Sequence, residues 1–192
     1  MTNETFSAEE SLQLIRNMIE KTRQGFSGSS HYFLIWGWAT LLALLGQFVL
    51  KAIFKNPYHY HVWWISVLCF VITMLLQRNE RRRLKVKTYV GEGMGYLWTG
   101  LGITFFVFCL LFFRLGWQNC YPFFITLYGV GTYVSGKILQ FQPLVWGGII
   151  CWMLAAIAVW FSMDEQMLFA AGAILISYII PGHLLRIKYH HS

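Results

Sequence analysis

The sequence predicts an all-α integral membrane protein with six transmembrane helices, and three observations lead to this fold class. Of its 192 residues, 57% are hydrophobic and only 12% are charged, which is far from the composition of a soluble domain. The apolar residues gather in stretches of about 20, the length that a helix needs to cross a hydrocarbon layer about 30 Å thick. Short turns and one basic loop separate these stretches, so we expect no extramembrane domain of independent size.

The six predicted spans form a transmembrane domain over residues 31–188, and polar segments flank this domain. Residues 1–30 precede it as a cytoplasmic amphipathic helix with a linker, and residues 189–192 follow it as a C-terminal tail. The first thirty residues contain four glutamates and no apolar run with a cleavage site, so a cleavable signal peptide is not expected. The spans lie near residues 31–53, 61–77, 96–115, 121–140, 143–162 and 166–185.

Residues 11–26 form the predicted amphipathic helix. At 100° per residue, Leu12 and Ile15 fall on one face, whereas Arg16 and Arg23 fall on the other. Two interpretations of this helix stay open. It lies at the inner membrane surface and anchors the bundle, or it docks on cytoplasmic helix ends or on a partner protein.

The distribution of Lys and Arg predicts the orientation, because positive charges in short loops are retained on the cytoplasmic side. The side opposite the amino terminus receives only Lys51, Lys55 and Arg114. We therefore expect a multi-pass protein of the cytoplasmic membrane with both termini inside. The net charge of +7 is explained by this topology, so no nucleic-acid partner is expected. The other twelve basic residues fall on the amino-terminal side: Arg16, Lys21, Arg23, Arg78, Arg81, Arg82, Arg83, Lys85, Lys87, Lys137, Arg186 and Lys188.

The basic loop is the most concentrated positive charge in the chain. We expect it to contact anionic lipid head groups at the inner face of the bilayer. Whether the chain also binds a protein partner or a second copy of itself is left open by the sequence. The loop residues are Arg78, Arg81, Arg82, Arg83, Lys85 and Lys87.

An internal similarity suggests that the six spans are three tandem hairpins. The odd-numbered spans open on Trp36-Gly37, Trp98-Thr99-Gly100 and Trp146-Gly147, and the last two even-numbered spans close around Gly136 and Gly182. Because each unit has two spans, such hairpins would be parallel repeats about an axis along the membrane normal. The alternative is chance, since Trp and Gly are common near membrane interfaces.

Small residues and one proline predict packing features. Gly147, Cys151 and Ala155 recur every four residues, which favours close contact between helices in a membrane. The cysteines have no CxxC or metal-ligand spacing and are interpreted as packing residues. Pro181 lies inside the sixth span, where the missing N–H predicts a kink.

The usual groups for catalysis are absent from the predicted spans. The middle of every span lacks Asp, Glu, Lys, Arg and His, so we expect neither an enzyme nor carboxylate-based ion coupling. His59 and His61 have no Asp, Glu or Cys near enough to complete a metal site. Ser135-Gly136 lacks the preceding glycine of an intramembrane protease motif. No cofactor is expected.

Two polar side chains at the inner span ends and a set of uncharged polar ones at depth are the remaining candidates. Lys137 and His183 occupy equivalent repeat positions and would line an inner vestibule, unless they extend to the head groups. The sequence favours a small transporter or channel-like protein for a neutral or weakly anionic solute. The alternative is a membrane-anchored regulatory or scaffold protein that acts through its amino-terminal helix. The candidate polar path above the vestibule comprises Gln47, Thr126, Tyr128, Thr132, Tyr133, Ser135 and Tyr178.

Overall fold

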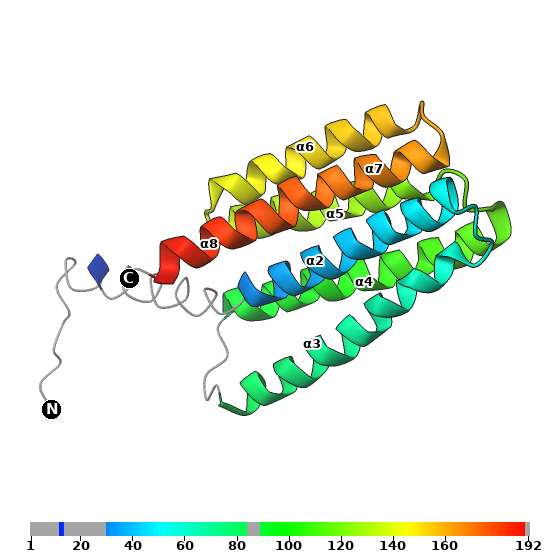
Figure 1. Ribbon diagram of the computed structural model, residues 1–192. Helices are drawn as coiled ribbons and strands as arrows, with labels where there is room; N and C mark the ends of the chain where they lie inside the picture. Colours follow the sequence, from blue (N-terminus) through cyan, green and yellow to red (C-terminus); the bar gives the residue numbers. More distant parts are fainter. Residues whose placement is uncertain (1–11, 14–29, 84–88, 191–192) are drawn as a thin grey trace, which may run out of the picture.

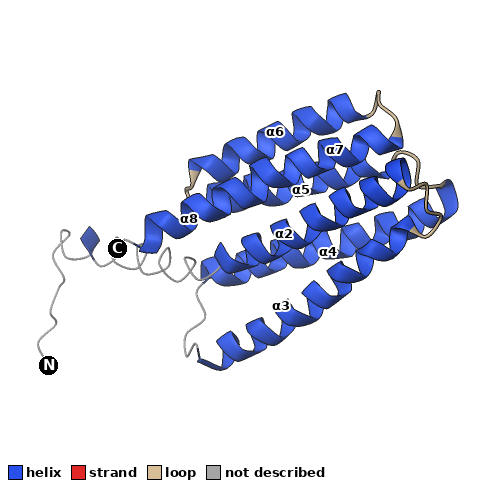
Figure 2. Ribbon diagram, viewed as in Figure 1, coloured by secondary structure: helices blue, strands red, loops and turns tan. Residues whose placement is uncertain are grey.

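The computed structural model describes residues 12–13, 30–83 and 89–190, and the predicted amino-terminal helix lies almost entirely outside them. Within the described ranges all regular structure is helical, and no strand is present (Figure 2). The fold is therefore all-α, as the sequence predicts. The elements are α2 (Ser30–Phe48), η1 (Val49–Ile53), η2 (His59–Trp63), α3 (Trp64–Arg83), α4 (Tyr89–Leu115), α5 (Cys120–Ile138), α6 (Gln142–Ala158), α7 (Met163–Ile174), η3 (Leu175–Ile179) and α8 (Ile180–His190).

The described helices form a bundle of rods that alternate in direction along the chain (Figure 1). The π-helical turn η1 continues α2, the 3-10 turn η2 leads into α3, and the π-helical turn η3 joins α7 to α8. The start of α2 and the end of α8 lie at the same end of the bundle. We call this the inner end and the opposite one the outer end, after the predicted topology.

Four rods are long and apolar enough to cross a membrane. The predicted spans in α5 and α6 do not meet the same measure, because α6 has only 17 residues and α5 carries Tyr, Thr, Gly and Ser along its length. Length and composition thus indicate a membrane protein, with four candidate spans among the described residues where the sequence predicts six. The four are His31–Ile53, His59–Asn79, Gly91–Leu115 and Met163–Ile187.

Several helices are longer than their apolar stretches. Helix α4 begins at Tyr89, seven residues before the predicted span, and α8 continues to His190. Hydropathy locates the residues that suit hydrocarbon, whereas backbone hydrogen bonding continues a helix into the polar interface. The predicted span limits therefore do not coincide with the helix limits.

Glycines bring α5 and α6 into the most extensive helix contact among the described residues. A Cβ atom on Gly148 would lie 2.7 Å from the backbone nitrogen of Tyr133, and one on Gly136 would lie 2.7 Å from that of Val145. Neither position has room for a side chain. Close backbone approach of this kind is how helices associate in lipid, where apolar burial gives little driving force.

The predicted ridge of small residues is buried. Gly147 packs against η3, since an added Cβ would lie 3.0 Å from the Cα atom of Ser177. Cys151 is fully buried and Ala155 is 5% exposed. The prediction that this face makes close helix contacts is confirmed.

Aromatic side chains attach α4 to α5. The rings of Phe105 and Phe124 have centroids 4.7 Å apart, and those of Phe112 and Phe123 are 5.4 Å apart. Tilted and edge-on pairs at these distances are favourable ring contacts. The opposite side of α4 is exposed, and Phe113 is 84% accessible.

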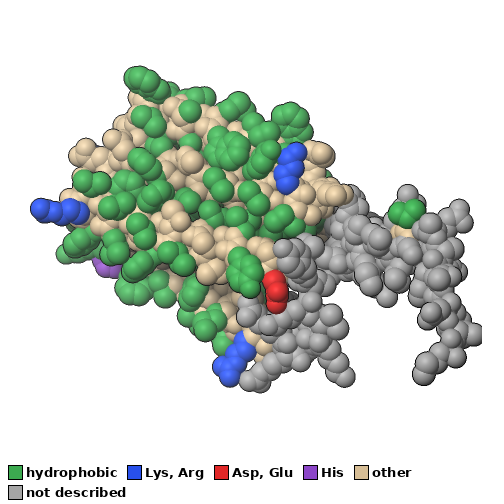
Figure 3. Space-filling view, turned by 180° about the vertical axis from the view of Figure 1, so that it is seen from behind, with side chains coloured by type: hydrophobic (Ala, Val, Ile, Leu, Met, Phe, Trp, Pro, Cys, Tyr) green, Lys and Arg blue, Asp and Glu red, His purple; other side chains and the backbone are tan. Residues whose placement is uncertain are grey.

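Helix α3 contacts α2 at the outer end and diverges from the bundle toward the inner end (Figure 1). Just before α3 begins, Val62 of η2 packs against α2, since a Cβ on Gly46 would lie 3.2 Å from a Val62 methyl group. Farther along α3, apolar residues such as Leu68 and Met74 are exposed. From behind, hydrophobic side chains cover much of the described surface, and charged ones lie toward the ends (Figure 3). This distribution suits a lipid-facing surface.

The backbone departs from α-helical geometry next to Pro181. This proline has no N–H to donate to the carbonyl of Ser177, which lies within the π-helical turn η3. Such turns occur often at functional sites. The sequence predicts a kink at this position, and the structure places the π-helical turn directly before it.

Candidate functional site

Five uncharged polar side chains follow the inward face of α2 and its neighbours. Thr40 and Gln47 are two turns apart on α2 and are 4% and 3% exposed. Two tyrosines of α5 and one of η3 face them. We call this set the interior polar row, and it consists of Thr40, Gln47, Tyr121, Tyr128 and Tyr178.

Gln47 is the centre of the outer half of the row. Its Oε1 accepts hydrogen bonds from Trp63 Nε1 at 2.6 Å and from the hydroxyl of Tyr121 at 2.7 Å. Its Nε2 lies 3.2 Å from His59 Nδ1. Because an indole nitrogen can only donate, the Trp63 contact fixes which side of the Gln47 amide is the oxygen. One side chain thus joins α2, η2 and α5.

Tyr178 occupies the inner half of the row. Its ring contacts those of Tyr128 and Phe33, both with centroids 5.6 Å away, and that of Trp98 at 6.2 Å. The Tyr128 side chain lies beside Thr40 of α2. The Tyr178 hydroxyl is buried without a hydrogen-bond partner among the described residues. A polar group buried in this way costs free energy, so it marks a candidate contact point for a ligand.

Close approach of η3 to α2 brings Tyr178 into this position. A Cβ on Gly37 would lie 3.0 Å from Ile179 Cγ1 and 3.1 Å from Tyr178 Cβ. Gly37 therefore lets η3 lie directly against α2. The Trp36-Gly37 pair that the sequence singles out as a repeat element thus has a packing role in the first span.

An ion pair and two amide contacts surround the outer end of the row. Lys51 Nζ donates to Asp164 Oδ1 at 2.5 Å, and both side chains are partly exposed. Gln166, which is fully buried, donates to Asn119 Oδ1 and to the carbonyl of Phe161, both at 3.0 Å. These contacts tie the start of α7 to η1 and to the turn before α5.

The structure brings three members of the predicted polar path, Gln47, Tyr128 and Tyr178, into the row. Thr132 and Ser135 are also buried, but Thr132 donates to the carbonyl of Tyr128 on its own helix at 2.5 Å. Ser135 Oγ has no hydrogen-bond partner among the described residues.

The remaining two members of the path lie elsewhere. Thr126 is exposed and donates to the carbonyl of Pro122 at 2.8 Å. Tyr133 packs on Trp152 of α6, with ring centroids 5.2 Å apart. The interior polar row thus contains only part of the predicted path, and it lies on the side of α5 that faces α2.

Lys137 and His183, the predicted vestibule residues, are both exposed. Lys137 Nζ lies 5.6 Å from the ring centroid of Tyr133, one turn earlier on α5. Among the predicted head-group residues, Arg78 is exposed on α3. Arg81, Arg82 and Arg83 lie in the last turn of α3, and Lys85 and Lys87 lie outside the described residues.

Sequence reasoning missed Thr40, Tyr121 and Trp63. Thr40 could have been found, because it precedes Gln47 by seven residues and so shares its helix face. Tyr121 and Trp63 carry no comparable signal, since their role depends on which helices are neighbours. His59, considered from the sequence only as a metal ligand and set aside, contacts Gln47.

Comparison of the chain with protein-family models, curated proteins and solved structures finds no match. The functional argument therefore depends on the residues of the interior polar row and on their surroundings.

Proposed function

We propose that the chain is a small transporter or channel-like protein for a neutral or weakly anionic solute. The interior polar row carries this proposal, because it places hydroxyl and amide groups from α2, α5 and η3 inside a bundle of apolar helices. Polar groups at such depth are costly and are typically retained for a function. Within the row, the Tyr178 hydroxyl is buried and has no hydrogen-bond partner among the described residues, so it is the group that we expect to contact a passing solute.

The chemistry of the row suits an uncharged or weakly charged solute. Its members offer hydrogen-bond donors and acceptors that can replace those of water around a small polar molecule. No member of the row is ionisable near neutral pH, apart from the adjoining His59. The proposal therefore includes neither proton nor cation coupling through a carboxylate.

Removal of one hydroxyl from the row tests this function. We expect Tyr178→Phe to lower solute flux about fivefold, because one hydrogen bond to the solute contributes about 1 kcal/mol. The free energy of unfolding should stay the same or rise, since the hydroxyl has no described partner. The measurement is stopped-flow light scattering of liposomes that contain the full chain, with glycerol, urea and formate as probes.

Tyr96→Phe is the matched control, because Tyr96 is 75% exposed on α4 and should not affect flux. Equal flux in Tyr178→Phe and the unaltered protein would contradict the role of the row. If the flux of all three probes were no faster than in protein-free liposomes, the chain would not be a pore for solutes of this class. A co-purifying protein that is lost when residues 1–28 are deleted would then favour the regulatory or scaffold alternative.

We also propose that all six rods cross the cytoplasmic membrane, with both termini inside. The alternating rod directions and the near absence of Lys and Arg from the outer end support this topology. The arrangement as three parallel hairpins stays a proposal that depends on the shared Trp-Gly openings. The extensive α5–α6 contact joins two different hairpins of that scheme.

Cysteine labelling in intact cells tests the topology. A membrane-impermeant maleimide should label Lys55→Cys and Gln118→Cys at the outer end. It should label Lys137→Cys and His183→Cys at the inner end only after the cells are permeabilised. The unaltered chain, with its four cysteines in the apolar helices, gives the background. Labelling of the inner pair in intact cells would reverse the proposed orientation.

A further inference from the structure

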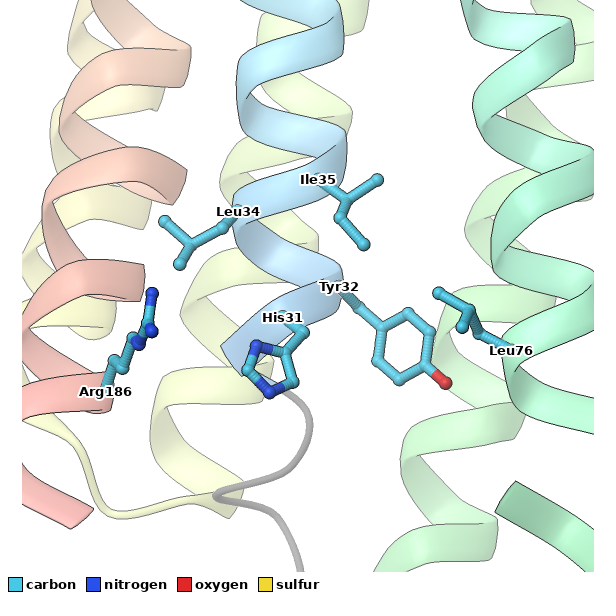
Figure 4. Close-up of a pocket in the computed structure, with 6 residues that line it drawn as sticks. All are labelled: His31, Tyr32, Leu34, Ile35, Leu76 and Arg186. Carbon is cyan, nitrogen blue, oxygen red and sulfur yellow. The ribbon is translucent and has the colours of Figure 1, made fainter. Parts of the chain in front are cut away.

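A cleft of about 370 Å³ opens at the inner end of the bundle, between α2, α3 and α8. Its volume is within the range of small-molecule sites. The interior polar row lies on another face of α2, so the cleft is a separate feature. Its lining residues are His31, Tyr32, Leu34, Ile35, Leu76 and Arg186 (Figure 4).

The lining has a cationic part and an apolar part. Arg186 of α8 and His31 of α2 lie on the side near the inner end (Figure 4). Leu34 and Ile35 lie farther into the bundle on α2, and Leu76, which is 40% exposed, lines the α3 side of the cleft (Figure 4). A guanidinium beside an apolar wall matches an amphiphile with an anionic head and a hydrocarbon tail.

Helix packing explains why Arg186 and His31 lie toward the same end of the cleft. A Cβ on Gly182 would lie 3.0 Å from Leu34 Cδ2, so α8 contacts α2 closely at this level. The two helices run in opposite directions. One turn toward the inner end from this contact, α8 therefore presents Arg186 and α2 presents His31.

Because α3 diverges from α2, the cleft is open at the outer surface of the bundle. The turn η2, which leads into α3, packs against α2 at Gly46 through Val62 at the outer end, and α2 and α3 separate toward the inner end (Figure 1). If the bundle spans the bilayer in the proposed orientation, the cleft opens at the depth where the head groups of the inner leaflet meet the acyl chains.

We propose that this cleft binds one anionic phospholipid of the inner leaflet. Its phosphate contacts Arg186 and His31, and an acyl chain lies along Leu34, Ile35 and Leu76. Charge complementarity selects an anionic over a zwitterionic lipid, because Arg186 is cationic and the described residues that line the cleft include no acidic side chain. The apolar wall distinguishes a lipid from free phosphate. This inference does not depend on solute transport and adds a ligand to the protein.

Native mass spectrometry of the purified, delipidated full chain tests the site, with phosphatidylglycerol and phosphatidylcholine as probes. We expect the unaltered protein to prefer phosphatidylglycerol. Arg186→Gln should weaken its binding about tenfold, as the loss of a charge-assisted hydrogen bond predicts. Arg186→Lys should keep most of the binding. Arg114→Gln at the outer end removes the same charge and should have no effect.

A second pair of variants tests the acyl-chain part without changing charge. Leu76→Trp should fill the cleft and weaken phosphatidylglycerol binding. Leu75→Trp is the control, because Leu75 is the adjacent exposed residue of α3 and does not line the cleft. Equal binding by Arg186→Gln and Arg114→Gln, or by the two Trp variants, would overturn the site. Displacement of the lipid by equimolar inorganic phosphate would show a site for a free anion and overturn the lipid assignment.

Discussion

Gly148→Val is expected to destabilise the protein by about 3 kcal/mol, at the upper end of the usual cost of overpacking. The Cβ atom alone would lie 2.7 Å from both Cβ and the backbone nitrogen of Tyr133, and 2.8 Å from the carbonyl oxygen of Gly129. Backbone atoms cannot move aside as the end of a flexible side chain can, so α5 and α6 would have to separate. Unfolding by SDS in mixed micelles measures this change in free energy.

Gly102→Val is the matched control for this substitution. Gly102 lies on α4, where an added Cβ would meet no described atom within 4 Å. Valine is a better helix former than glycine, so the control should keep or slightly raise the stability. Equal stability of the two variants would show that the glycine contact between α5 and α6 does not hold the bundle together.

The sequence was a good guide to local structure, because local structure depends on hydropathy and spacing along one segment. The helices lie where the apolar stretches are, and the small residues Gly147, Cys151 and Ala155 are buried as predicted. The kink predicted at Pro181 rests on a single missing N–H group, and the π-helical turn η3 ends at Ile179, shortly before this proline. Each of these inferences needs no knowledge of which helices are neighbours.

The sequence was a weaker guide to the candidate site, because a site depends on the direction in which each helix faces. Depth in the membrane can be estimated from position in a span, and this correctly selected Gln47 and Tyr178 as interior residues. The same reasoning included Thr126 and Tyr133, which have a similar depth but face away from the row. Thr40 and Tyr121 were missed, since their partners come from other helices.

Gln47→Leu is expected to destabilise the protein by about 2 kcal/mol. The substitution removes the acceptor of two hydrogen bonds, those from Trp63 Nε1 and from the Tyr121 hydroxyl. Both donors would stay in place without a partner, and an unsatisfied buried donor costs about 1–3 kcal/mol. The effect stays below the sum for two donors, because hydrogen bonds between membrane helices contribute less on average than those in isolated models. The same unfolding measurement in mixed micelles reports the loss.

Two further variants distinguish the stability that comes from the hydrogen bonds of Gln47 from the effect of replacing an amide by an apolar side chain. Gln142→Leu makes the same change at an exposed residue and should alter stability by less than about 0.5 kcal/mol. Tyr121→Phe removes one stranded donor, so it should cost less in the Gln47→Leu background than in the unaltered protein. This non-additivity is the signature of a direct interaction. Additive costs for Gln47→Leu and Tyr121→Phe would instead mean that the two side chains stabilise the bundle independently, and that the outer half of the row is not a connected network.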